Sequence, residues 1–195
     1  MGEFIYIALG YNRQGGGDEG VVEEYRSIYR YDPARDTYTR VADAPITGCY
    51  IASGPYKGKV YAVPGSYREY GFHRDYHWAD GALMYDPALD RWTQIHAPRV
   101  KKRVFLLTQC SASVVEDGKL WLVGGMAENR TRTVVTEYFD IEKGVFVRGP
   151  DIAYGRCGGG IADGVLTIIG GFFVDGAGLG APALPTWTLE TDKHK

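Results

Sequence analysis

The sequence has little cysteine, and its cysteines form no recognisable pattern. There are three in 195 residues, at Cys49, Cys110 and Cys157, and none of them belongs to a CxxC spacing. An odd number without that spacing excludes a disulfide framework and a zinc knuckle. Their apolar or glycine-rich neighbours predict ordinary buried thiols, and we expect a reduced, cytoplasmic setting.

Long hydrophobic runs and an excess of one charge are also missing. No apolar stretch approaches the roughly 18–20 residues that a membrane-spanning helix needs. The N-terminus has neither the basic start nor the small-residue cleavage site of a secretory signal. Lys and Arg number 22 against 24 for Asp and Glu, a net charge of −2. The sequence therefore predicts no membrane partner and no general affinity for nucleic acid.

Glycine and tyrosine, in contrast, are abundant. The chain contains 27 Gly and 15 Tyr, and apolar residues make up 45% of it. Glycine is typical of tight turns, and tyrosine favours strands. This composition indicates a folded protein of many short strands joined by turns.

An internal repeat organises these strands. Four apolar segments end in glycine: FIYIALG (4–10), KVYAVPG (59–65), KLWLVGG (119–125) and VLTIIGG (165–171). Three later segments carry two aromatic residues seven positions apart: Tyr31 and Tyr38, Tyr85 and Trp92, Phe139 and Phe146. The first aromatic recurs every 54 residues, from 31 to 85 and from 85 to 139. Such a fixed period indicates a repeat architecture.

Each repeat predicts four antiparallel strands, which we call a to d in chain order. Alternation of apolar and polar residues in KVYAV and SIYRY is typical of strands, and the Asp-Pro turns in YDPARDTY and YDPALDRW would join strands c and d. The first repeat begins at strand b, and the fourth stops before strand d. We therefore expect units of three, four, four and three strands, 14 in all.

These residues resemble the kelch repeat, the unit of one class of β-propeller. The resemblance rests on Gly124-Gly125, on Gly170-Gly171, on Tyr-Asp-Pro at 31–33 and 85–87, and on Trp92. The chain departs from the pattern where Leu9-Gly10 and Pro64-Gly65 replace glycine pairs and where Phe139 and Phe146 replace Tyr and Trp. The resemblance implies an all-β, kelch-type propeller domain over residues 1–195. Its blades would span approximately 4–42, 49–96, 105–148 and 157–195.

An open arc of four blades would expose apolar faces and strand edges, which propellers normally remove by closing a ring. Three interpretations remain open: a head-to-tail homodimer, a ring completed by another half-propeller chain, or a fragment of a longer protein. We expect the homodimer, with contacts through the first blade (4–38) and the last (165–189).

In the kelch family, the b–c and d–a loops commonly form the binding surface. The second b–c loop, SYREYGFHRDYHWADG, is rich in aromatic and basic residues. Long loops on a rigid scaffold are where function concentrates, whereas the opposite face has only tight turns, which we expect to be too short for a pocket. The candidate ligand-binding residues are Arg68, His73, Arg74, His77, Trp78, Arg103, Tyr154 and Arg156.

The chemistry of these residues suits a protein or peptide, or an apolar or anionic small ligand. Aromatic side chains supply contact area, and arginine can hold a carboxylate or phosphate bidentately. His73 and His77, with Asp75 and Asp80 nearby, could ligate a metal, but HxxxH in a loop is a weak signal, and we expect neither metal nor cofactor.

Two functions therefore remain open. The first is an interaction module, the commonest role of kelch propellers. The alternative is a kelch-type enzyme of small-molecule chemistry, such as a cyclase or sugar-acid isomerase, with its site at the propeller mouth. No nucleophile–base set is recognisable, so no catalytic residue is assigned.

Overall fold

The computed structural model describes residues 4–8, 11–14, 21–24, 26–46, 50–64, 66–68, 76–78, 81–98, 112–124, 134–151, 159–162, 164–168 and 187–190. Eighteen β-strands, and no helix, are found in these residues. The all-β class expected from the sequence is therefore confirmed.

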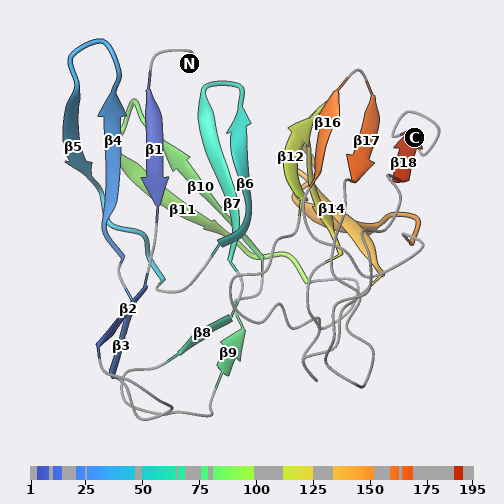
Figure 1. Ribbon diagram of the computed structural model, residues 1–195, viewed down its shortest axis with the longest axis horizontal. Coiled ribbons are helices and arrows are strands. Elements are labelled where there is room, and N and C mark those ends of the chain that lie inside the picture. Colours follow the sequence, from blue (N-terminus) through green and yellow to red (C-terminus); the bar gives the residue numbers. More distant parts are fainter. Residues whose placement is uncertain are drawn as a thin grey trace.

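Fourteen of the strands form four antiparallel sheets, of three, four, four and three strands (Figure 1). We call these sheets blades 1 to 4. Blade 1 contains β1 (Ile5–Ala8), β4 (Ile28–Asp32) and β5 (Thr37–Val41). Blade 2 contains β6 (Tyr50–Tyr56), β7 (Lys59–Pro64), β10 (Ala82–Asp86) and β11 (Arg91–Ile95). Blade 3 contains β12 (Ala112–Glu116), β13 (Lys119–Val123), β14 (Thr136–Asp140) and β15 (Val145–Arg148). Blade 4 contains β16 (Gly159–Ala162), β17 (Val165–Ile168) and β18 (Trp187–Glu190).

The other four strands form two ribbons that the sequence analysis treated as loops. β2 (Tyr11–Gln14) pairs with β3 (Val21–Glu24), and β8 (Ser66–Arg68) pairs with β9 (Tyr76–Trp78). Each ribbon is inserted between strands b and c of its blade. The b–c connections of blades 1 and 2 are thus partly regular structure.

The seven-residue spacing of the aromatics has a simple structural cause. Tyr31 and Tyr38 are cross-strand partners, as are Tyr85 and Trp92, and Phe139 and Phe146. Their ring centroids lie 4.7, 5.1 and 5.0 Å apart, respectively. Cross-strand aromatic pairs of this kind stabilise antiparallel sheets. The repeat read from the sequence is therefore a repeated contact between strands c and d.

The acidic residues of the c–d turns act as expected. The Oδ1 atoms of Asp32 and Asp86 accept hydrogen bonds from the backbone N–H groups two residues later, at 2.9 and 3.0 Å. Asp36 and Asp90 close the same turns with φ of 51° and 47°, a conformation that Asp tolerates better than most residues. These interactions fix the turns, so the aromatic pairs stay in register.

The described core lies mainly between blades 2 and 3. Leu120, Leu122 and Phe139 are 0% exposed and pack in one cluster with Val63 and Ala82 of blade 2. In the pairing of β13 with β14, Leu120 lies directly opposite Phe139, so both residues are on the same face of blade 3. That face is therefore covered by the preceding blade.

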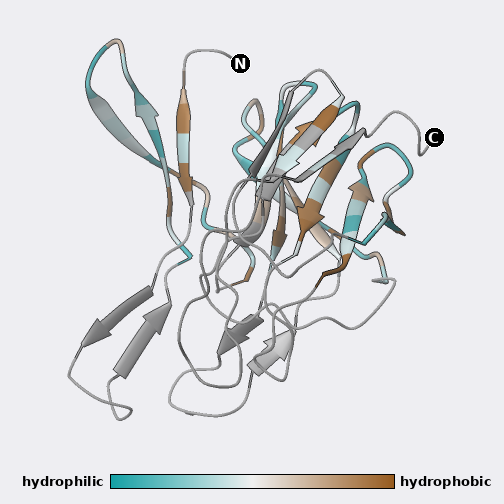
Figure 2. Ribbon diagram, turned by 45° about the vertical axis from the view of Figure 1, so that its right-hand side comes forward, coloured by the Kyte–Doolittle hydropathy of each residue, from teal (hydrophilic) through white to brown (hydrophobic). Residues whose placement is uncertain are grey.

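The same face of blade 1 is open. Ile5 and Ile7 of β1 stand opposite Tyr31 and Tyr29 of β4, as Leu120 stands opposite Phe139 in blade 3. Ile5 is 55% exposed, Ile7 47%, Tyr29 40% and Tyr38 63%. Figure 2 shows hydrophobic colour on β1, the strand next to the N label. We call Ile5, Ile7, Tyr29 and Tyr38 the open face of blade 1.

Some sequence expectations lie outside the described residues. These are the three cysteines and the terminal glycines of the repeat segments, Gly10, Gly65, Gly125 and Gly171.

Candidate ligand-binding face

The two ribbons extend toward the same end of the molecule. In Figure 1, β2–β3 and β8–β9 lie below the blades, whereas the turns joining β4 to β5 and β6 to β7 lie at the opposite end. The scaffold therefore separates a ribbon face, built by b–c connections, from a turn face, built by tight turns.

Three of the eight candidate residues are in the β8–β9 ribbon. Arg68 is paired with Tyr76, His77 with Tyr67, and Trp78 with Ser66. The remaining candidates lie outside the described residues: His73, Arg74, Arg103, Tyr154 and Arg156. The structure therefore gives the backbone position of Arg68, His77 and Trp78 and does not test whether the eight residues meet.

The turn face contains a hollow that the sequence analysis did not expect. An open depression of about 420 Å³ is lined by Asp117, Lys119, Asp140, Glu142 and Lys143. The expectation that tight turns are too short to form a pocket is therefore wrong. The residues come from two turns of blade 3, the β12–β13 turn and the β14–β15 turn, which together line an open depression.

The charges lining this hollow are largely neutralised by ion pairs. Lys143 Nζ lies 2.8 Å from Asp140 Oδ2, and Glu142 accepts hydrogen bonds from Lys57 Nζ and the Tyr56 hydroxyl of blade 2. The bond from Lys57 lowers the pKa of Glu142, and the bond to Glu142 raises the pKa of Lys57. A hollow of balanced, exposed ion pairs has little charge left for a ligand.

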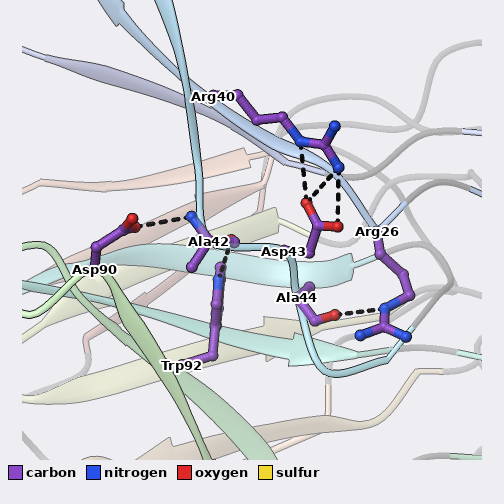
Figure 3. Close-up of polar contacts among 7 residues, drawn as sticks. All are labelled: Arg26, Arg40, Ala42, Asp43, Ala44, Asp90 and Trp92. Atoms are coloured by element: carbon purple, nitrogen blue, oxygen red, sulfur yellow. Dashed lines mark hydrogen bonds and ion pairs between the residues drawn. The ribbon is translucent and has the colours of Figure 1, made fainter.

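The junction between blades 1 and 2 is a hydrogen-bonded clamp (Figure 3). The backbone N–H of Ala42, just after β5, donates to Asp90 Oδ1 at 2.8 Å. Trp92 Nε1 donates to the carbonyl of the same Ala42 at 2.9 Å. Beside this clamp, Arg26 Nε donates to the carbonyl of Ala44 at 2.8 Å, and Arg40 binds Asp43. The aromatic pair of blade 2 therefore also positions blade 1.

The clamp shifts two pKa values. The N–H of Ala42 and, next, the hydroxyl of Tyr85 stabilise the Asp90 carboxylate and lower its pKa. Burial and the hydrogen bond to Asp90, 2.7 Å long, raise the pKa of Tyr85. The carboxylate and the neutral phenol are thus the forms that hold the junction together.

Blade 1 contains the groups that match Tyr85, Asp90 and Trp92 of blade 2. The Tyr31 hydroxyl donates to Asp36 Oδ1 at 3.0 Å, as the Tyr85 hydroxyl donates to Asp90. Tyr38 stands where Trp92 stands in blade 2. Sequence reasoning recognised these residues only as repeat markers. The second role of the equivalent residues of blade 2, Asp90 and Trp92, is contact with the preceding blade, and only the structure shows it.

Glu137 is a further residue that the sequence analysis missed. It is 1% exposed in β14, opposite Leu122 of β13. A buried carboxylate is uncommon. The sequence signal that could have found it is a glutamate at the repeat position that Leu83 occupies in blade 2.

In the part of the chain that the structure describes, no group of three or more His, Cys, Asp or Glu side chains could hold a metal ion. That part also contains no helix long and apolar enough to span a membrane.

The fold is that of a kelch-type β-propeller. Among solved structures, the chain is similar to that of YjhT, with a TM-score of 0.69 and 18% sequence identity. The match covers 90% of this chain and 58% of the other. No protein-family model matches the sequence.

The relatives found by sequence are kelch proteins. The chain is 27% identical over 115 residues to Kelch-like protein 15 of Danio rerio. This match covers 59% of this chain and 17% of the relative. It is 25% identical over 160 residues to Kelch-like protein 35 of Mus musculus, covering 80% and 24%. It is 22% identical over 132 residues to Kelch repeat and BTB domain-containing protein 8 of Danio rerio, covering 66% and 18%.

These similarities confirm the resemblance to kelch-repeat proteins that the repeat indicated. They are distant, and each match spans less than a quarter of its relative's length.

Proposed function

We propose that the chain is a kelch-type interaction module that binds a protein or peptide through its ribbon face. The observation that supports this proposal is the common direction of the β2–β3 and β8–β9 ribbons, away from the tight turns. Each ribbon is a two-stranded antiparallel sheet of its own, inserted between two strands of a blade, and so adds surface beyond the blade. Sites of this kind are typical of connections held by a stable scaffold.

The proposed contacts come from the eight residues that the sequence nominated. Arg68, His77 and Trp78 are placed in the β8–β9 ribbon, and we assign the other five to the same face as part of the proposal. Arginine favours carboxylates, and tryptophan supplies area at low entropic cost, so a peptide with both an acidic and an apolar residue fits best. Successive strand positions alternate between two faces, so a ligand on one face of the ribbon meets either position 77 or position 78.

The test uses peptides selected by phage display on the purified chain, with affinity then measured by isothermal titration calorimetry. We expect Trp78→Ala and Arg68→Ala to weaken binding tenfold or more while the thermal unfolding midpoint stays unchanged. Lys143→Ala on the turn face is the matched control and should bind as the wild type does. Equal affinity of Trp78→Ala, Arg68→Ala and the control would contradict the proposed face.

An enzymatic role lacks a comparable observation. In the described ranges, the depression of the turn face is lined by ionisable side chains, and these are largely ion-paired. A nucleophile beside an oriented base, which covalent catalysis needs, is not seen there.

We also propose that a second copy of the chain completes the propeller ring. The open face of blade 1 supports this proposal, because the corresponding face of blade 3 is fully covered by blade 2. Blades 1 and 4 lie at opposite ends of the row of blades in Figure 1, so a head-to-tail arrangement would bring blade 4 of one copy to blade 1 of the next. An exposed apolar patch on a soluble domain commonly marks such an interface.

A cytoplasmic setting remains part of the proposal. It is supported by the small number of cysteines and by the absence of a CxxC spacing in the sequence.

A further inference from the structure

Arg26 is fixed to the backbone at the base of the β2–β3 ribbon. It lies in the short segment between the end of β3 and the start of β4. Its Nε atom donates to the carbonyl of Ala44 at 2.8 Å, and its own carbonyl accepts a hydrogen bond of 2.8 Å from the N–H of Ala44. Ala44 belongs to the connection from blade 1 to blade 2. Arg26 therefore joins a b–c connection to a d–a connection.

The segment that holds Arg26 is itself held in place. Ala44 is completely buried. Two residues earlier, Ala42 is bonded through its N–H to Asp90 and through its carbonyl to Trp92. Figure 3 shows the Arg26 guanidinium anchored beside this clamp by its bond to Ala44. A guanidinium on such a support keeps its direction before any ligand arrives, so it loses little conformational freedom on binding.

Arg26 differs from other arginines of the described chain in having no acidic partner there. Three arginines each bind a carboxylate three residues away: Arg35 with Asp32, Arg40 with Asp43, and Arg148 with Asp151. Arg26 is exposed, and within the described residues its guanidinium is bonded through Nε to a backbone carbonyl and not to a carboxylate. Its Nη1 and Nη2 groups have no bond in that part of the chain.

The unbonded side of this guanidinium suits a carboxylate. Arginine binds a carboxylate best through two parallel N–H bonds, which add specificity as well as energy. Because Nε is already bonded to Ala44, the edge between Nη1 and Nη2 is the side that a carboxylate can approach. Lysine could not present the same pair of donors, because its ammonium is a point charge on a flexible stem.

We propose that Arg26 binds an acidic side chain of the peptide that the ribbon face takes. This inference rests on the proposed function and names a group that would select its ligand. Arg26 is not among the eight candidate residues taken from the sequence. It places acid recognition at the base of the β2–β3 ribbon of blade 1, whereas Arg68 lies in the β8–β9 ribbon of blade 2.

The first test needs no variant. Phenylglyoxal, a dicarbonyl that condenses with guanidinium Nη groups, is added to the whole chain, and the modified arginines are identified by mass spectrometry. We expect Arg26 to react at least fivefold faster than Arg148, whose Nη2 is held by both oxygens of Asp151. The peptide N-acetyl-Leu-Glu-Leu-amide should slow the reaction of Arg26 at least fivefold. It should not slow that of Arg91, an exposed residue beside the β10–β11 turn.

The second test measures acid preference directly. Fluorescein-labelled Leu-Glu-Leu-amide and its matched analogue Leu-Gln-Leu-amide are compared by fluorescence anisotropy. We expect the wild type to prefer the glutamate peptide at least fivefold. Arg26→Gln should remove this preference, and Arg26→Lys, which keeps the charge without the paired donors, should retain less than half of it. Arg148→Gln is the control and should keep it in full.

Three results would overturn the inference. One is equal affinity of the two peptides for the wild type. Another is an unchanged preference in Arg26→Gln whose thermal unfolding midpoint matches the wild type. The third is modification of Arg26 as slow as that of Arg148. If Glu23→Gln, at the same three-residue spacing as the other pairs, then makes that modification fast, the chain's own carboxylate occupies the guanidinium.

Failure of the ribbon-face proposal gives a different result. In that case the peptides selected by phage display bind Trp78→Ala and Arg68→Ala as they bind the wild type. A glutamate preference that still depends on Arg26 would then support this inference without the ribbons. A preference lost in Arg68→Gln and kept in Arg26→Gln would overturn it and leave the ribbon face in place.

Discussion

Blades 1 and 3 show what the same repeat pattern becomes in two different surroundings. Ile5 and Ile7 of β1 occupy the same positions in their blade as Leu120 and Leu122 of β13. Tyr31 of β4 likewise corresponds to Phe139 of β14. The blade 3 residues are completely buried against blade 2, whereas both isoleucines of blade 1 are exposed. An apolar residue in this repeat is thus a core residue only where a preceding blade covers it.

The difference has an energetic consequence. Burying a large aliphatic or aromatic side chain contributes about 1.5–3 kcal/mol relative to leaving it exposed. Blade 3 gains this contribution at Leu120, Leu122 and Phe139, and blade 1 gains little of it at Ile5 and Ile7. Blade 1 depends correspondingly more on its junction with blade 2.

The largest expected effect comes from breaking the covered face. Phe139→Ala removes a fully buried ring from the cluster between blades 2 and 3 and should cost about 3–5 kcal/mol of the free energy of unfolding. Ile7→Ala, at the open face, should cost less than about 1 kcal/mol, because little transfer free energy is lost there. Urea unfolding followed by tryptophan fluorescence measures both. Comparable losses would mean that the open face is covered in solution.

The clamp at Asp90 should give an intermediate effect. Asp90→Ala removes the acceptor for the N–H of Ala42 and should cost about 1–2 kcal/mol. Asp36→Ala is the matched control, since Asp36 keeps the turn and the tyrosine bond but has no described contact with another blade. An equal loss in the two variants would show that the turn, and not the junction, carries the effect.

The clamp also predicts a pH dependence. Because the pKa of Asp90 is lower in the folded state than its ordinary value of 3.8, its contribution is fully present above that value. The contribution is lost as the pH falls through the lower, folded-state pKa. Asp90→Asn should therefore be less stable than wild type at pH 6, and the gap between the two should narrow toward pH 3. A constant gap over that range, measured by thermal unfolding, would contradict this assignment.

The smallest effect on stability, and the most informative about assembly, is expected from a charge on the open face. Ile7→Glu should change the free energy of unfolding by about 0.5 kcal/mol or less. If a second copy completes the ring, the same substitution should lower the dimer fraction in light scattering at least tenfold. Leu89→Glu, an exposed turn position of blade 2, is the control and should leave the dimer fraction unchanged. A monodisperse wild-type monomer at high concentration would contradict ring completion.

Much of the fold could be predicted from the sequence because its signals are local. The spacing of Tyr85 and Trp92 already defines a c–d hairpin, since a short turn leaves the two residues opposite each other. The β8–β9 ribbon could not be predicted in the same way, because its strands are three residues long and are separated by a long segment. The candidate site was predictable only as residue types on one loop face, and three of its eight residues now have a backbone position.

The sequence by itself determined the strands of the four blades, their turns and the aromatic pairs, because each depends on residues within one hairpin. Only the tertiary structure showed that Leu120 is buried and Ile5 is exposed, that Asp90 and Trp92 hold the backbone of the preceding blade, and that the turn face has a hollow. Those properties depend on which blade lies next to which. Burial and hydrogen bonding between blades come from surfaces brought together across about 50 residues, and no local pattern records them.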